Sequence, residues 1–226
     1  MARGLMPSVL LGTLVSARSL HRVALCAVAV IALAAGPACA DKCTGAKLRA
    51  MGQKEAGLLG CQAKVAATND STGLAACEMK VKGKFFGAFG KAGACIGDET
   101  TCENKADACE TNVASAMTET FPSRCEATKR KAAGKLASGE LRCYQKAAAK
   151  GIALEAGCIP KVEGKFSRAL TMAGTCPDGG SPQALVENNC VQPAVTTDGG
   201  GMVTDVCPTT ITTTGASPRS CSTSSP

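Results

Sequence analysis

The chain has 226 residues, with 25 Lys and Arg against 18 Asp and Glu, 15 Cys, one Tyr, five Phe and no Trp. Its one histidine is His21. Beyond that position there is no imidazole, which excludes Ser–His and Cys–His nucleophiles and the commonest neutral metal ligand. The small number of aromatic side chains also excludes a large autonomous core. Disulfides are therefore expected to be required for folding. The small excess of basic over acidic residues says little about which kind of partner the protein binds.

Residues 1–40 predict a secretory signal peptide. Arginines without any acid precede an apolar run at 23–35, and Ala38-Cys39-Ala40 offers a cleavage site after Ala40. Two alternatives stay open: an uncleaved anchor, although the apolar run is short for a bilayer, and a lipid-modified Cys39. Export to the periplasm or beyond implies an oxidising compartment, where cysteines form disulfides.

The cysteine spacing predicts an internal duplication. Successive gaps of 18, 16, 18 and 14 residues recur as 18, 15, 18 and 14. Other residues follow the same offset of 82, then 81: Lys80-Val81-x-Gly83-Lys84-Phe85 matches Lys161-Val162-x-Gly164-Lys165-Phe166. The cysteines of the two series are Cys43, Cys61, Cys77, Cys95 and Cys109, then Cys125, Cys143, Cys158, Cys176 and Cys190.

The same spacing predicts which cysteines pair. Eighteen residues make five helical turns, about 27 Å, so the two cysteines of one helix share a face but cannot bond each other. If consecutive helices return antiparallel, each hairpin is closed at both ends. The predicted bridges are Cys43–Cys95, Cys61–Cys77, Cys125–Cys176 and Cys143–Cys158. Of the remaining Cys102, Cys109, Cys190, Cys207 and Cys221, we expect Cys190–Cys207 to pair.

Apolar periodicity supports helices throughout these segments. The stripe from Cys77 to Cys95, and its copy from Cys158 to Cys176, has a helical period and places Phe85 and Phe166 as the bulky groups of two thin cores. Short turns at 69–73, with Ser71 or Thr72 as N-cap, and at 150–153 join the hairpin arms, and Ser123 is expected to cap the helix after Pro122. A third helix is expected at 97–117, with a shorter counterpart at 181–189.

These observations predict an all-α protein of two tandem disulfide-stapled antiparallel helical hairpins, each followed by an extra helix. The expected boundaries are a signal peptide at 1–40, a first unit at 41–121, a second at 122–190 and a Thr/Ser/Gly/Pro-rich flexible tail at 191–226.

The second unit also carries a family resemblance. The run Cys125-x3-Lys129-x4-Gly134-x8-Cys143, followed by Gly157-Cys158-x5-Gly164-Lys165-Phe166 and Gly174-x-Cys176, resembles exported, cysteine-rich helical-repeat proteins of environmental bacteria. The resemblance covers Cys43 to about Cys190. It implies the helical-repeat fold and supplies no activity.

No motif in the chain predicts catalysis, a cofactor or a resident metal. There is no Cys-x-x-Cys and no phosphate-binding glycine loop. The acid pairs Asp98/Glu99 and Glu103/Asp107 fit partners of a helix dipole better than metal ligands. Cys102 and Cys109, seven residues apart, could form a soft-metal pair, but export favours disulfides to other cysteines.

The favoured function is a non-enzymatic, disulfide-stabilised structural or interaction scaffold with an unknown protein or cell-surface partner, touching membrane only through its signal segment. An alternative is a binder of anionic polymers or phosphate groups through Lys80, Lys82 and Lys84 and through Lys129-Arg130-Lys131. Because acids are interspersed and aromatic residues for base stacking are missing, we expect a solvated face there and no nucleic-acid binding. A thiol-based soft-metal binder is the further alternative.

Overall fold

A computed structural model of the protein describes residues 41–117, 122–174 and 182–209. The predicted signal peptide at 1–40 lies outside these ranges, as do Cys176 and Cys221. Among the described residues, no helix is both long and apolar enough to cross a membrane.

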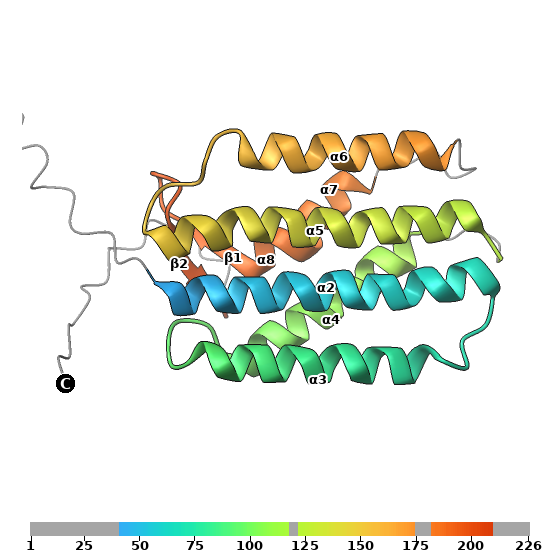
Figure 1. Ribbon diagram of the computed structural model, residues 1–226, viewed down its shortest axis with the longest axis horizontal. Helices are drawn as coiled ribbons and strands as arrows, with labels where there is room; N and C mark the ends of the chain where they lie inside the picture. The colour runs from blue at the N-terminus through green and yellow to red at the C-terminus, as the bar shows by residue number, and fades with distance from the viewer. Residues whose placement is uncertain (1–40, 118–121, 175–181, 210–226) are drawn as a thin grey trace, which may run out of the picture. The chain divides into compact units, whose positions relative to one another are not determined.

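Four helices lie side by side in one layer: α3 (Leu74–Ala92), α2 (Lys42–Thr68), α5 (Arg124–Lys150) and α6 (Cys158–Ala173). Each hairpin thus places its first helix at the centre of the layer and its second at an edge (Figure 1). The predicted all-α fold of two disulfide-stapled hairpins is confirmed.

The ends of the central helices follow local chemistry. Asp41 caps α2 by accepting a hydrogen bond from the backbone N–H of Cys43 at 2.8 Å, and Ser123 caps α5 as predicted, through the N–H of Glu126 at 3.1 Å. At their C-termini, Asn69 and Gly151 adopt left-handed backbone with φ of 57° and 60°. The prediction of a Ser71 or Thr72 cap for α3 is wrong, because α3 starts after Gly73 without a side-chain cap.

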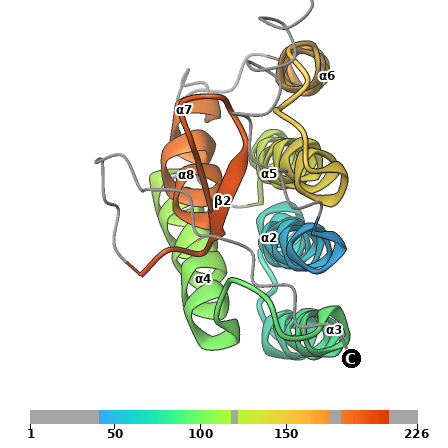
Figure 2. The ribbon, with the colours of Figure 1, turned by 90° about the vertical axis from the view of Figure 1, so that its left-hand side faces the viewer.

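A second layer covers one face of the first (Figure 2). It contains α4 (Glu99–Ala116) and a segmented counterpart made of α7 (Gln183–Val186), the π-helix η1 (Glu187–Val191) and α8 (Gln192–Ala194). These agree with the predicted extra helix of each unit.

The expected start of the tail is wrong. After α8, the strands β1 (Val195–Thr197) and β2 (Val203–Val206) pair antiparallel, and Val206 and Cys207 are buried. Ordered structure therefore continues well beyond residue 191, and the part of the expected tail at 210–226 lies outside the described residues.

The two central helices approach closely because small residues face each other. A Cβ on Gly52 would lie 3.1 Å from the Cα of Ser138, and one on Gly134 would lie 3.0 Å from the Cα of Ala56. Under the predicted offset of 82, Gly52 corresponds to Gly134 and Ala56 to Ser138. The contacts between α2 and α5 are therefore reciprocal, like those of a two-fold symmetric interface.

Each hairpin uses the same knob-in-hole contact. Val81 of α3 lies against Gly57 of α2, and Val162 of α6 lies against Gly139 of α5. Phe85 and Phe166 are both buried, as expected, and Phe89 joins the core from α3. The core is shared between the hairpins, so the predicted units at 41–121 and 122–190 pack as one body.

Five disulfides lie within the described residues. Three have the pairing that the hairpin geometry predicts: Cys43–Cys95, Cys61–Cys77 and Cys143–Cys158. Cys125 is also disulfide-bonded, and its predicted partner Cys176 lies outside the described residues.

The expected Cys190–Cys207 bridge is wrong. Cys190 pairs with Cys109, and Cys207 pairs with Cys102. The first of these joins positions that the predicted offset relates, across the second layer. The second fastens β2 to α4, because the strand pair carries Cys207 back over the start of that helix.

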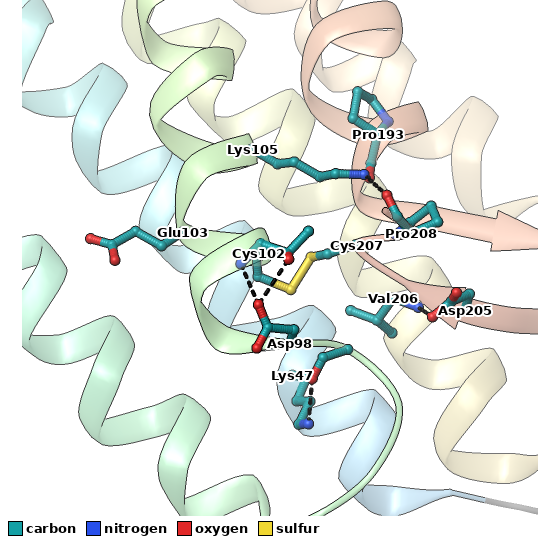
Figure 3. Close-up of a disulfide and its surroundings, with 12 residues drawn as sticks. Lys47, Asp98, Cys102, Glu103, Lys105, Pro193, Asp205, Val206, Cys207 and Pro208 are labelled. Atoms are coloured by element: carbon teal, nitrogen blue, oxygen red, sulfur yellow. Dashed lines mark hydrogen bonds between the residues drawn. A yellow bond between two sulfur atoms is a disulfide. The ribbon is translucent and has the colours of Figure 1, made fainter. Parts of the chain in front are cut away.

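Lys105 strengthens the attachment of this C-terminal segment (Figure 3). Its Nζ donates to the carbonyl oxygen of Pro193 at 2.8 Å and to that of Pro208. Burial lowers the pKa of Lys105, while the charge of Asp205 acts in the opposite direction. One α4 side chain thus holds both ends of the strand pair next to Cys102–Cys207.

Candidate functional site

The exposed stripe of α5 consists of basic side chains. Its members recur at spacings of seven and four residues, which places them on one helix face. That face points away from the second layer, because Glu126 and Glu140, on the opposite side of the helix, are buried. The stripe consists of Arg124, Lys131, Lys135, Arg142, Lys146 and Lys150.

Neighbouring helices extend this stripe over the whole layer. On α3, Lys82 turns toward α4 and Val81 toward α2, so the lysines on the remaining flank share the open side with the α5 stripe. On α6, Val162 and Glu163 fix the orientation in the same way. The added cations are Lys42, Arg49, Lys64, Lys80, Lys84, Lys91, Lys161, Lys165 and Arg168, all exposed. We call the two sets together the basic face.

Acidic side chains gather on the other side of the layer. Among the described residues, no ion pair involves a side chain of the basic face. The acids Glu103 and Asp107 lie on α4 instead, and Glu187 lies on η1. Within the described residues, the exposed basic side chains named above are therefore concentrated on one surface.

The basic clusters expected from the sequence are partly wrong. Lys80 and Lys84 are exposed, but Lys129 and Arg130 are buried, with 5% and 4% of their surface exposed. Arg130 pairs with Glu126 at 2.7 Å and donates to the carbonyl oxygen of Met117 at 2.9 Å. Consecutive basic residues in a helix point in different directions, so a charge run in sequence does not form a surface patch.

Ion pairs connect the first hairpin, α2 and α3, to α4. Nζ of Lys54 lies 2.9 Å from Oδ1 of Asp107, and Nζ of Lys82 lies 2.8 Å from its Oδ2. Burial opposes ionisation of Asp107, but hydrogen bonds and charges from Lys82 and Lys54 lower its pKa below the ordinary value. Glu103 and Asp107 are thus neutralised by built-in cations, a role that the helix-dipole interpretation missed.

The second unit has a cluster of three carboxylates in the corresponding region. Glu140 of α5, Glu163 of α6 and Glu187 of η1 each place a carboxylate oxygen within 4.8 Å of the others. Burial raises the pKa of Glu140 to about 7, and the charges of Glu187 and Glu163 act in the same direction. Nε2 of Gln183 donates to Oε1 of Glu187 at 2.9 Å. Nothing in the sequence predicted this cluster, because its members lie on three separate helices.

Thiol chemistry has little support in the described part of the chain. Cys102 and Cys109 are both in disulfides, so the suggested soft-metal pair offers no thiolate. A cavity of about 20 Å³ beside Cys143–Cys158 has room for about one water molecule.

Fold and surface define a disulfide-stapled, two-layer helical protein with one basic face. Comparison with known proteins finds no matching family model, no matching curated protein and no matching solved structure. The resemblance to exported helical-repeat proteins stays a prediction.

Proposed function

We propose that the protein is an exported, non-enzymatic binding scaffold, built by internal duplication and locked by disulfides, whose basic face binds an anionic polymer. The observation that carries the proposal is the separation of charge between the two faces of the four-helix layer. Rows of cations spaced along side-by-side helices match a polymer that repeats its negative charge, rather than one small anion.

The scaffold part of the proposal is supported by covalent and electrostatic ties. Disulfides close the hairpins and fasten the second layer, as is typical of proteins in oxidising compartments. A rigid layer presents its charges in a fixed pattern, so little entropy is lost on binding. One of the two reasons for expecting only a solvated face, the interspersed acids, no longer holds, because Glu103 and Asp107 on α4 and Glu163 on α6 face the other way.

An anionic polysaccharide suits this surface better than a nucleic acid. The stripes that form the basic face contain no aromatic side chain among the described residues, so bases would have nothing to stack on. Recognition would then depend on charge and spacing, as expected for a sulfated, phosphorylated or uronic acid polymer.

The test is affinity for dextran sulfate at low and high salt, with uncharged dextran as the reference. We compare the wild type with a K131Q/K135Q/R142Q variant, which neutralises three cations on α5. Each contributes about 1 kcal/mol near an anionic surface at low salt, so the affinity should fall about 100-fold. Binding should also weaken steeply as salt rises.

The matched control changes net charge equally on the far side. The N104D/A108E/T111E variant adds three negative charges at exposed positions of α4. It should bind dextran sulfate nearly as well as the wild type. Equal losses in both variants, or no binding by the wild type at low salt, would refute the proposal.

A further inference from the structure

We propose that Glu140, Glu163 and Glu187 form a binding site for a hard divalent cation of the Ca²⁺ type. Their carboxylate oxygens come from three separate elements and lie within 4.8 Å of one another. Oxygen atoms of carboxylates are the ligands that such ions prefer, and water can complete the coordination shell. This site is independent of the basic face, which lies on the opposite side of the layer.

Glu140 provides the observation that points to a ligand. Only 3% of its surface is exposed, and its Oε1 is buried without a hydrogen-bond partner among the residues that the structure describes. An ionised carboxylate buried without a partner is costly, since neither water nor protein replaces its hydration. Two further carboxylates beside it raise that cost, and a bound cation would remove it for all three.

In the first unit, the acids at the corresponding place are neutralised by lysine side chains of the protein itself. In the aligned motifs Lys80–Phe85 and Lys161–Phe166, Lys82 occupies the position of Glu163. Lys82 forms an ion pair with Asp107 of α4, joining the hairpin edge to the second layer. Glu163 reverses that charge and faces Glu187 of η1, so the equivalent connection in the second unit requires a cation from outside.

The groups around the cluster are consistent with this assignment. Among the described residues, no Lys or Arg forms an ion pair with any of the three glutamates. Tyr144 lies one turn from Glu140, and burial together with the charges of Glu140 and Glu187 raises its pKa. A bound cation would fasten α6 and η1 to α5, the helix that carries Glu140.

Tyr144 makes the site directly observable. It is the single tyrosine of a chain without tryptophan, so energy transfer from tyrosine to Tb³⁺, a Ca²⁺ substitute, reports binding close to this residue. The metal-free oxidised protein should show tyrosine-sensitised Tb³⁺ emission that excess Ca²⁺ removes. In thermal unfolding, Ca²⁺ at about a hundredfold excess over its Kd should raise Tm by about 5–10 °C.

Two variants separate this site from non-specific binding. Glu140→Gln keeps the shape but removes the central charge, and should reduce sensitised emission at least about tenfold. Glu163→Lys reproduces the built-in cation of the first unit. It should raise the Tm of the metal-free protein and abolish the Tm shift caused by Ca²⁺.

Glu155→Gln is the matched control, because Glu155 is an exposed acid in the loop before α6. It should keep both the Tb³⁺ signal and the Ca²⁺ shift. If the wild type shows no sensitised emission, the proposal is overturned. So would a Glu163→Lys protein, folded by circular dichroism, that keeps the Ca²⁺ shift.

Discussion

Gly139 occupies a position where a single methyl group decides how the hairpin closes. A Cβ there would lie 2.5 Å from Cγ1 of Val162, well inside van der Waals contact. Valine in a helix has one strongly preferred rotamer, so its side chain has little freedom to move away. The glycine therefore lowers helix propensity locally but permits the close packing of α6 on α5.

We predict that Gly139→Ala destabilises the protein by about 1–3 kcal/mol, because the overpacking outweighs the gain in helix propensity. Gly164→Ala is the matched control, since a Cβ at Gly164 has no atom within 4 Å. It should leave stability unchanged or raise it by up to about 1 kcal/mol. Denaturant unfolding with intact disulfides measures both.

A double-mutant cycle identifies the cause. Adding Val162→Ala to Gly139→Ala should cost less than the two single changes together, by about 1 kcal/mol or more. Strict additivity would show that the loss in Gly139→Ala does not come from contact with Val162.

Glu55 is a second residue in an unfavourable environment, because its surroundings disfavour the ionised carboxylate. It is fully buried in α2, and neither carboxylate oxygen has a hydrogen-bond partner among the described residues. Burial raises the pKa of Glu55 well above its ordinary value, and the nearby charge of Lys54 offsets this only partly. Under the predicted offset, the corresponding residue of α5 is Ala137.

The raised pKa of Glu55 predicts that the stability of the fold decreases as pH rises. The folded protein binds the Glu55 proton more tightly than the unfolded chain does, so this contribution is complete below the ordinary pKa of 4.5. It is lost as pH rises through the higher folded pKa. Glu55→Gln removes this titration, so its unfolding free energy should exceed that of the wild type by about 1–3 kcal/mol at the alkaline end.

Unfolding by denaturant at a series of pH values checks this prediction. The difference between wild type and Glu55→Gln should shrink toward acidic pH. Glu155→Gln, at an exposed position, serves as the control. A constant difference at all pH values would show that ionisation of Glu55 does not contribute to stability.

At the scale of elements, the β1–β2 pair depends on its attachments. Two short strands are marginal alone. Here, β2 is fastened to α4 by Cys102–Cys207, and Lys105 binds the carbonyl oxygen of Pro193 before β1. Once Cys109–Cys190 has formed, Cys102–Cys207 closes a loop of only about 25 residues, which contributes about 3 kcal/mol.

We predict that replacing Cys102 and Cys207 together by Ala lowers the unfolding free energy by about 3 kcal/mol. Hydrogen exchange should show lost protection over residues 195–206, while amides of α2 and α5 stay protected.

The matched control replaces Cys61 and Cys77 by Ala. That disulfide spans 16 residues, so the expected cost is again about 3 kcal/mol. The lost protection should then appear at the start of α3 rather than in the strands. Unchanged exchange at 195–206 in the Cys102/Cys207 variant would show that the strand pair does not need its disulfide.

At the scale of the whole molecule, the layered arrangement separates charges that alternate in sequence. Lys80, Lys82 and Lys84 stand in one short run, yet only the first and third join the basic face. The middle one turns to Asp107 behind the layer. Successive residues of a helix rotate by about 100°, so net charge along the chain says little about the charge of a surface.

The sequence by itself determined the helices and the ends of the hairpins. Cysteines eighteen residues apart share a helix face, and a short antiparallel return then brings Cys77 to Cys61, as the structure shows. Short-range periodicity also identified Phe85 and Phe166 as core residues. These features depend on residues that are close in sequence, for which the helical repeat fixes the direction of each side chain.

Only the tertiary structure decided how the hairpins combine. The pairing of Cys109 with Cys190, and the meeting of Glu140, Glu163 and Glu187, depend on the second layer crossing the central helices. Packing of distant segments sets such contacts, and one sequence spacing is compatible with many of them. The expected Cys190–Cys207 bridge was wrong for this reason: the fold of residues 192–206 carries Cys207 to Cys102 instead.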